Sequence, residues 1–407
     1  MNYLFEIKRF GSSYLMRLLL YIFRIFPIKN NKIIASAVRG RRYADNPRYI
    51  VEELLRRERD LDVVWLKRSD SNYMVPESIR TVINRRNYIQ LAYEFATAKI
   101  IIMSHHAPAY YIKRKGQVFI QTWHGGLGIK KIELDAINFI KSSKYEIAEL
   151  KATNLADVFI SNSLHLSKLY RSAFNYSGPI FNCGYPKNDY LLGDKTAART
   201  KVRMDLNIMP EYKIVTYAPT FRDSFRQNGA WKADMSVYDI DYERILKAFE
   251  TKKGGNFVVL IKMHPNIQNS VHFERITNKH IIDATKYNDM QELVMASDFF
   301  ISDYSSCIFD AATAGIPCFT YAKDFDDYKS DRGVYYEMEE LPFPYAKNND
   351  EMEDNILNFD EKKYCEAWMN FAEKVELNET GHAAKDIADK ICEVLDGKPV
   401  NWNNSLI

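Results

Sequence analysis

Short β-branched runs alternate with longer helical patterns along most of this chain, and this alternation limits its possible folds. After residue 30 we predict six strands, then a stretch without strand character, then five more strands. The first set covers 32–38, 62–66, 99–104, 118–122, 157–161 and 180–183. The second set covers 213–217, 256–263, 280–283, 298–302 and 317–321. Apolar strands separated by helices are typical of parallel sheets covered on both faces.

Two sheets fit these strands better than one, because open sheets rarely exceed about ten strands. A chain of 407 residues also suits two domains of ordinary size. No strand pattern occurs between Asp189 and Tyr212, where we place the break. We therefore predict an α/β protein with two doubly wound domains. The predicted parts are a helix at 1–30, domains at 31–195 and 196–380, and a C-terminal helix at 381–407 that could return to the first domain.

The charge and the cysteines exclude several functions. A net charge of +3 gives no global field that would indicate nucleic-acid binding. The five cysteines are scattered, without metal-ligand spacing, which favours reduced thiols in a cytosolic protein. We expect Cys183, Cys307 and Cys318 to lie in the core, and we predict no metal site.

The first residues form a basic amphipathic pattern. Residues 1–42 contain nine Lys or Arg and a single acid, Glu6. Charges interrupt the apolar segment from Tyr3 to Phe26, so its uncharged runs are too short to span a bilayer. No cleavage site of a signal peptide follows the segment. A wide aromatic face with a basic stripe suits the surface of an anionic membrane. The alternative is a helix that packs on its own domain.

The run Trp123-His124-Gly125-Gly126 directly follows a predicted strand. In open α/β sheets, ligands bind beyond the carboxyl ends of the strands. A single histidine after a strand is more often structural. The neighbouring tryptophan and glycines favour function here, because glycine lets the backbone approach a ligand closely. We predict that His124 is catalytic.

Two further motifs end strands of the second set. Lys262 and His264 end a very apolar strand, where both could donate to phosphate oxygens. Asp303, Ser305 and Ser306 follow the predicted strand 298–302 and open a helix, where hydroxyls and free N–H groups can bind an anion. The alternatives are a surface histidine and simple N-capping by Ser305.

Smaller motifs follow the first strand of each set. Thr220 and Arg222 follow the first strand of the second domain, and we predict that both contact phosphate. Asp45 follows the first strand of the chain, just before Pro47. Its carboxylate could serve catalysis or only cap the helix that we expect from Pro47, and the spacing does not decide between them.

Taken in order, these motifs resemble the CDP-glycerol glycerophosphotransferase family, which includes teichoic-acid glycerol-phosphate primases and polymerases. The resemblance covers roughly residues 30–395. Two positions depart from the usual pattern: Gly126-Leu127 replaces Thr-Pro, and Lys187 replaces Arg; we placed both on or near the acceptor side. The motifs that carry the resemblance are Trp123-His124-Gly125, Gly184-Tyr185-Pro186-Lys187-Asn188-Asp189, Tyr217-Ala218-Pro219-Thr220, Met263-His264-Pro265, Ser302-Asp303-Tyr304-Ser305-Ser306 and Arg332-Gly333-Val334-Tyr335.

The resemblance implies a GT-B fold, with the acceptor on the first domain and a CDP-polyol donor on the second, across an interdomain cleft. It also implies a lipid-linked acceptor and peripheral attachment to the cytoplasmic face of the membrane. By position, His124 matches the catalytic histidine, and His264, Ser305 and Ser306 match the ligands of the donor diphosphate.

Two other functions remain open at the sequence level. One is a GT-B glycosyltransferase that uses a CMP- or UDP-sugar, and the other is a non-catalytic scaffold of a polymer-assembly complex. Retention of both His124 and His264 argues against the scaffold. We expect no resident cofactor; any Mg²⁺ would enter with the nucleotide. Glycerol is the expected polyol, although the sequence does not distinguish it from ribitol.

Overall fold

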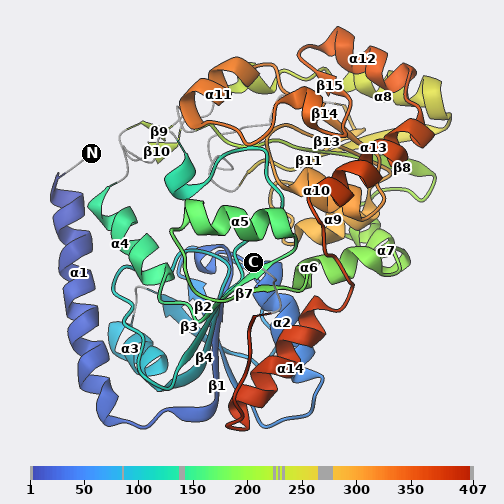
Figure 1. Ribbon diagram of the computed structural model, residues 1–407. Coiled ribbons are helices and arrows are strands. Elements are labelled where there is room, and N and C mark those ends of the chain that lie inside the picture. The colour runs from blue at the N-terminus through green and yellow to red at the C-terminus, as the bar shows by residue number, and fades with distance from the viewer. Residues whose placement is uncertain are drawn as a thin grey trace. The chain divides into compact units, whose positions relative to one another are not determined.

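The computed structural model describes residues 3–84, 87–136, 143–222, 226–227, 230–231, 234–264 and 278–403. They form two compact units, each with one parallel sheet (Figure 1). The predicted α/β class with two doubly wound sheets is therefore confirmed. The first unit consists of residues 1–124, 140–189 and 378–407, and the second of residues 125–139 and 190–377.

The first unit contains a seven-stranded sheet in the order β3-β2-β1-β4-β5-β6-β7, with every neighbouring pair parallel. The strand order reverses direction between β1 and β4, which makes this pair the topological switch point of the sheet. The strands are β1 (Lys29–Ser36), β2 (Asp62–Arg68), β3 (Arg80–Asn84), β4 (Ala98–Met103), β5 (Val118–Gln121), β6 (Val158–Ser161) and β7 (Ile180–Asn182).

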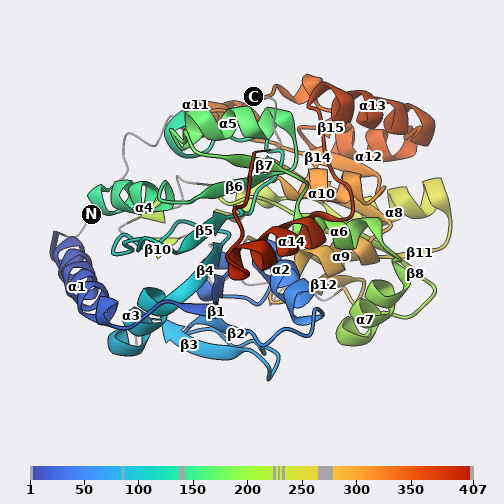
Figure 2. The ribbon, with the colours of Figure 1, turned by 60° about the horizontal axis from the view of Figure 1, so that its bottom comes forward.

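Helices lie on both faces of this sheet (Figure 1), because parallel strands are joined by long crossover connections that are usually helical. The C-terminal helix α14 packs against α2 and α6, and Figure 2 shows α14 beside α2. The helices of the first unit are α1 (Tyr3–Ile22), α2 (Asp45–Leu55), α3 (Tyr88–Thr97), α4 (Lys144–Thr153), α5 (Leu164–Ala173), α6 (Pro186–Asp189) and α14 (Ala383–Leu395).

The second unit contains a six-stranded parallel sheet in the order β12-β11-β8-β13-β14-β15. Its switch point lies between β8 and β13. The strands are β8 (Tyr212–Ala218), β11 (Asn256–Ile261), β12 (Ile281–Asp283), β13 (Phe299–Ser302), β14 (Cys318–Tyr321) and β15 (Tyr345–Ala346), with a separate hairpin of β9 (Arg226–Gln227) and β10 (Ala230–Trp231).

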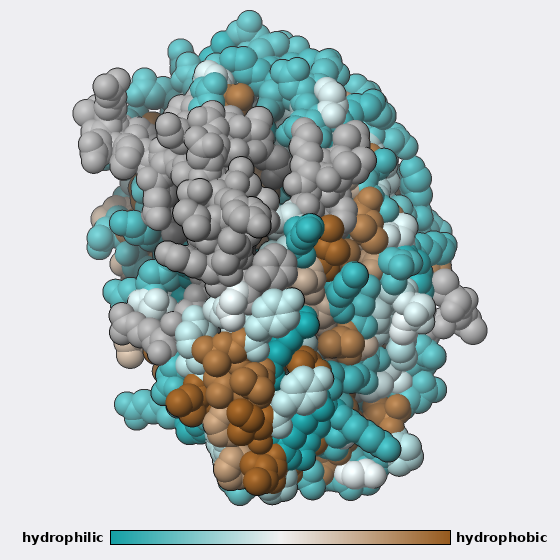
Figure 3. Space-filling model, turned by 90° about the vertical axis from the view of Figure 1, so that its left-hand side faces the viewer, coloured by the Kyte–Doolittle hydropathy of each residue, from teal (hydrophilic) through white to brown (hydrophobic). Residues whose placement is uncertain are grey.

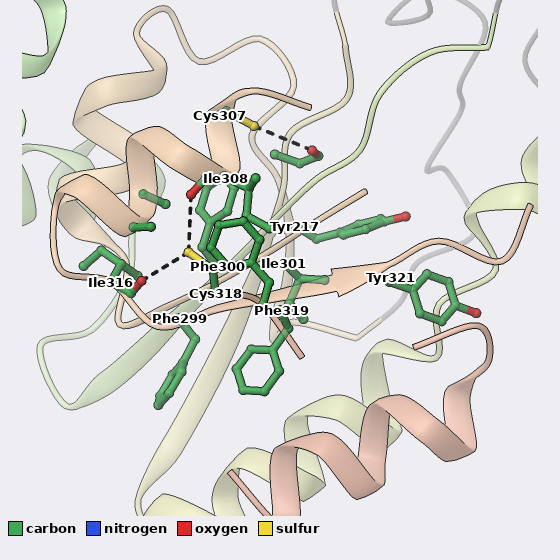
Figure 4. Close-up of a cluster of buried hydrophobic side chains, with 14 of the residues drawn as sticks. Tyr217, Phe299, Phe300, Ile301, Cys307, Ile308, Ile316, Cys318, Phe319 and Tyr321 are labelled. Carbon is green, nitrogen blue, oxygen red and sulfur yellow. Dashed lines mark hydrogen bonds between the residues drawn. The ribbon is translucent and has the colours of Figure 1, made fainter. Parts of the chain in front are cut away.

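Buried aromatic and aliphatic side chains form the core around β13 and β14 (Figure 4). Cys307 and Cys318 belong to this core and Cys183 is buried in the first unit, which confirms the predicted placement of the three thiols. Burial raises the pKa of Cys307 to about 11, so this thiol stays protonated at neutral pH. The helices are α7 (Thr196–Leu206), α8 (Tyr242–Lys253), α9 (Met290–Ala296), α10 (Cys307–Thr313), α11 (Phe325–Arg332), α12 (Asn349–Leu357) and α13 (Glu361–Lys374).

Residues 125–139 belong to the second unit, although they precede the main passage between the two units at Asp189–Tyr190. The Lys131 N–H donates to the Gly333 carbonyl at 3.0 Å, and the Tyr335 N–H donates to the Ile129 carbonyl at 2.7 Å. The Tyr335 hydroxyl also donates to Asp135 at 2.8 Å. The Arg332-Gly333-Val334-Tyr335 motif therefore anchors residues 129–135. Leu127, one of the positions that depart from the family pattern, is buried in the core of the second unit.

Helix α1 packs one side against its own unit and leaves several large apolar side chains exposed to solvent. Ser13, Met16 and Leu20 are buried, and Arg17 donates to the Ala109 carbonyl at 2.7 Å. Lys32, which we had counted with the basic segment, is buried and paired with Glu94 at 2.6 Å. The exposed apolar residues gather over this helix and the turn after it (Figure 3); they are Tyr14, Leu15, Leu18, Tyr21, Ile22, Ile25 and Phe26. We call these seven residues the α1 apolar stripe.

Candidate functional site

The predicted catalytic histidine lies beyond the carboxyl end of β5, next to the switch point of the first sheet. Its Nδ1 atom lies 2.8 Å from the carbonyl oxygen of Ser104, which follows β4. A carbonyl oxygen can only accept, so Nδ1 of His124 carries the proton. The lone pair of the neutral ring is then on Nε2, and the exposed imidazole can act as a base through that atom.

Two buried amides hold the backbone that leads to His124. Gln121 accepts from the Trp123 N–H at 2.9 Å and donates to the His105 carbonyl at 3.0 Å. Asn46, at the start of α2, donates to the carbonyls of Thr122 and Trp123 at 3.3 and 3.2 Å. Neither Gln121 nor Asn46 is exposed to solvent. These amides connect the loops after β1, β4 and β5.

Backbone strain is concentrated in the same loops. Val38, Arg39, Asp45 and Trp123 have positive φ angles of 48°, 55°, 64° and 50°. Residues with a side chain rarely adopt this left-handed conformation, and it persists where surrounding contacts enforce it. Observed strain at the strand ends beside a switch point supports a functional role for this part of the first unit.

Two histidines near His124, His105 and His106, were not predicted to belong to the site. His105 Nδ1 donates to the His106 carbonyl at 2.9 Å, so its Nε2 accepts from the Ser36 hydroxyl at 2.9 Å. Burial, reinforced by the charge of Arg39, lowers the pKa of His105 to about 3. His105 is therefore neutral at physiological pH. The available signal was the pair of histidines that directly follows the apolar strand β4.

Asp45 lies at the first position of α2, and the helix begins there rather than at Pro47. The N-cap residue is Ala44, whose side chain makes no capping hydrogen bond. The carboxyl group of Asp45 is buried. The pKa of the Tyr170 hydroxyl is raised, mainly because the hydroxyl is buried and in part because of the negative charge of Asp45. Asp45 therefore lies close to Tyr170, whose hydroxyl is hydrogen-bonded to that of Tyr185.

The Gly184-Tyr185-Pro186-Lys187-Asn188-Asp189 motif organises the first unit around Asn46 and the C-terminal segment. The Lys187 N–H donates to the Asn46 side chain at 3.2 Å. Asp189 accepts from the first N–H groups of α14, at Ala383 and Ala384 (3.0 and 2.7 Å). Gly184 has a φ of +92°, and a Cβ atom there would lie 2.9 Å from the Asn378 carbonyl, so only glycine fits.

Three of the predicted donor-site residues in the second unit form one buried cluster. Asp303 accepts from the Thr220 N–H at 2.7 Å and from Arg222 Nη1 at 2.9 Å. Arg222 is also paired with Asp324 at 2.6 Å through Nε and lies over the Tyr304 ring. Burial works against its charge, but the two carboxylates outweigh it and hold the pKa of Arg222 above its ordinary value.

This cluster changes the role that we assign to Arg222. Four of the five N–H groups of its guanidinium donate to Thr220, Asp303 and Asp324, so the side chain is committed to structural partners. Asp303 is likewise buried and occupied by donors. The hydroxyl of Thr220 is buried without a hydrogen-bond partner in the described part of the chain. Arg222 and Asp303 therefore position the loops after β8 and β13.

Lys262 does not have the accessible ammonium group that a phosphate ligand requires. Its ammonium is buried and donates to the carbonyls of Thr285 and Tyr287, in the loop after β12. The carbonyls that follow a short edge strand have no ladder partner, and a lysine at the end of the adjacent strand satisfies them. Lys262 is therefore a structural residue rather than a phosphate ligand.

The remaining donor-site residues are partly accessible. The His264 ring packs 4.5 Å, between centroids, from the Phe221 ring, which places it beside the Thr220–Arg222 loop. Ser305 accepts from the Cys307 thiol at 3.2 Å. Ser306, not Ser305, is the N-cap residue of α10, and its side chain makes no capping hydrogen bond. The motif residues Pro265 and Asn266 lie outside the described residues.

Within the described ranges, no group of three or more His, Cys, Asp or Glu side chains is arranged to hold a metal ion. Among the same residues, no helix combines the length and the apolarity needed to cross a bilayer.

The chain is similar to several known proteins. The chain is 28% identical to the teichoic acid poly(glycerol phosphate) polymerase of Staphylococcus epidermidis over 93% of its length, but spans only about half (51%) of that protein. It is 27% identical to the polymerase of the same name from Bacillus spizizenii, covering 93% of this chain and 97% of that one. It also superposes on a solved structure of the wall teichoic acid polymerase TagF with a TM-score of 0.80 and 25% identity, covering 98% and 99% of the two chains. The family model for CDP-glycerol:poly(glycerophosphate) glycerophosphotransferases matches residues 18–393, and the chain belongs to this family.

Proposed function

We propose that this protein transfers a polyol phosphate, glycerol phosphate in the first instance, from a CDP-polyol to a lipid-linked glycan or growing teichoic-acid-type polymer. In this reaction an acceptor hydroxyl oxygen forms a bond to the β-phosphorus. The bond from that phosphorus to the bridging oxygen breaks, and CMP leaves with the electron pair. The acceptor proton passes to a base.

The observation that carries this proposal is the geometry of His124 in a chain of this family. Its Nδ1–H is fixed on the Ser104 carbonyl, so Nε2 is the atom that would take the acceptor proton. His105 next to it is held neutral. No positive charge on His105 therefore works against protonation of His124.

The donor diphosphate is assigned to the second unit. His264, Ser305 and Ser306 are the partly accessible polar side chains at the ends of β11 and β13. They would donate to phosphate oxygens, on which charge builds as CMP leaves. The cluster of Arg222, Asp303 and Asp324 supports them by fixing the loops. The proposal assigns no protein-held metal; a Mg²⁺ ion, where required, would be part of the nucleotide substrate.

The acceptor is proposed to be reached at the cytoplasmic face of the membrane. The α1 apolar stripe supports this, because seven large apolar residues on one helix and its following turn are 44–82% exposed. An apolar helical face of this kind can insert into the headgroup region of a bilayer without spanning it. Arg17 and Arg24 donate to the Ala109 and Lys113 carbonyls and so fix the helix on its unit.

A donor panel tests the proposal. The purified protein would be incubated with a lipid-linked acceptor and CDP-glycerol, CDP-ribitol, a CMP-sugar or a UDP-sugar, and nucleotide release would be measured. We expect CMP release with a CDP-polyol, and its loss in His124→Ala with CDP-glycerol affinity unchanged. The matched control is His382→Ala at an exposed position. Sugar transfer would instead indicate a glycosyltransferase, and no turnover with any donor would indicate a scaffold.

A further inference from the structure

The strained turn before His124 is enforced by four side-chain hydrogen bonds. Trp123 is 4% exposed and has a φ of +50°, a conformation that a bulky residue does not adopt unaided. Its N–H donates to Gln121, and its carbonyl accepts from Asn46 and from the Thr122 hydroxyl (3.1 Å). Asn46 also binds the adjacent Thr122 carbonyl.

Gln121 acts on both ends of the hydrogen bond that His124 makes. Through its oxygen it fixes the N–H of Trp123, the residue before His124. Through its nitrogen it fixes the carbonyl of His105. His105 directly follows Ser104, and the Ser104 carbonyl accepts from His124. A single buried amide therefore sets the separation between His124 and the carbonyl that determines its tautomer.

We propose that Gln121 and Asn46 are positioning residues for the reaction, which hold His124 with its proton on Nδ1 and its lone pair on Nε2. The proposal rests on the proposed role of His124 as the base. Asn46 adds a third loop to the arrangement, because its oxygen accepts from the Lys187 N–H. Positions 46 and 187 are thereby coupled to the catalytic turn although neither needs to touch the substrate.

The strand β5 offers a matched control at its other end. Gln117 is also buried, at 4% exposure, and its amide donates to the carbonyls of Phe95 and Ala98 at 2.6 and 2.9 Å. Its amide oxygen accepts from the Arg114 N–H, and in the described part of the chain it makes no hydrogen bond to residues 104–105 or 123–124. Gln117→Met therefore removes the same chemical group from the position just before the same strand, at a distance from His124.

The experiment compares Gln121→Met with Gln117→Met in two measurements. In steady-state assays, Gln121→Met should lower kcat by tenfold or more with the KM for CDP-glycerol within twofold, whereas Gln117→Met should change neither. The acid limb of the kcat/KM profile should move to lower pH in Gln121→Met, because the carbonyl no longer stabilises the protonated imidazole. Nitrogen-15 NMR of the histidine rings should show Nδ1-protonated His124 in the parent and a tautomer mixture in Gln121→Met.

The NMR measurement separates this inference from the proposed function, because it requires no turnover. If the parent does not transfer from CDP-glycerol, the proposed function fails and the tautomer still decides the role of Gln121. If Gln121→Met is poorly folded, Asn46→Ser supplies the same comparison. An unchanged tautomer together with a kcat no lower than that of Gln117→Met would overturn the inference.

Discussion

The residues assigned to the donor phosphates give the sharpest test of the second unit. His264→Ala and Ser306→Ala should each weaken binding of CDP-glycerol by about 1.5–3 kcal/mol, because each removes a hydrogen bond to a charged group. Calorimetry on the single variants measures this directly. Ser330→Ala is the control, since its hydroxyl bonds only to the backbone of its own helix. Unchanged affinity in both variants would remove these side chains from the donor site.

His105 makes a prediction about pH. Its pKa is about 3 in the folded protein, below the value of about 6.5 expected for the unfolded chain. The unfolded chain therefore binds a proton that the folded chain excludes, and the stability contributed by neutral His105 is lost as the pH falls below about 6.5. Between pH 7.5 and 5.5 this loss is about 1.4 kcal/mol. Urea unfolding of His105→Asn should show a correspondingly smaller decrease; an identical decrease in both proteins would contradict it.

For single residues, the sequence predicted which ones follow a strand better than it predicted what their side chains contact. His124, His264 and Ser306 follow strand ends, and the strand pattern alone located them. Lys262 and Arg222 also follow strands, but Lys262 donates to a carbonyl 23 residues away, and Arg222 pairs with carboxylates 81 and 102 residues away along the chain. A partner distant in sequence leaves no local signal, so the buried roles of Lys262 and Arg222 could not be predicted.

Among the elements, α1 makes the clearest prediction. Leu18→Gln, Ile22→Gln and Ile25→Gln together should reduce binding to anionic liposomes on the order of a hundredfold or more, because three exposed apolar side chains lose their contact with the bilayer. Stability should change little, since these side chains are 58%, 54% and 82% exposed. Transfer to a lipid-linked acceptor should fall while transfer to a short soluble analogue is retained.

The control for these substitutions is Met204→Gln with Met369→Gln, at exposed apolar positions of the second unit. Full liposome binding by the α1 triple variant would contradict the membrane role of the helix. Deletion of the whole helix is a poorer test, because Met16 and Leu20 are buried and their loss would destabilise the unit. Periodicity predicted an amphipathic helix, but it could not show which of its sides packs against the unit.

Over the whole molecule, the strand pattern predicted the two parallel sheets but not every strand. Strands β3 and β15 were missed because Arg80–Asn84 is half polar and Tyr345–Ala346 is only two residues long. Residues 125–139 were assigned to the first domain because they follow its strands in sequence. Their membership of the second unit depends on Leu127 in its core and on the Arg332–Tyr335 turn, contacts that are distant in sequence.

The central claim is that the β-phosphorus travels with the polyol. The direct measurement uses CDP-glycerol radiolabelled at the β-phosphorus, a lipid-linked acceptor and the full-length protein, with His124→Ala in parallel. The account predicts that the label appears in the lipid-linked product, that unlabelled CMP is released in equal amount, and that both are lost in His124→Ala. Release of labelled CDP, with an unlabelled product, would show that the bond between the β-phosphorus and the bridging oxygen does not break. That result would contradict the account.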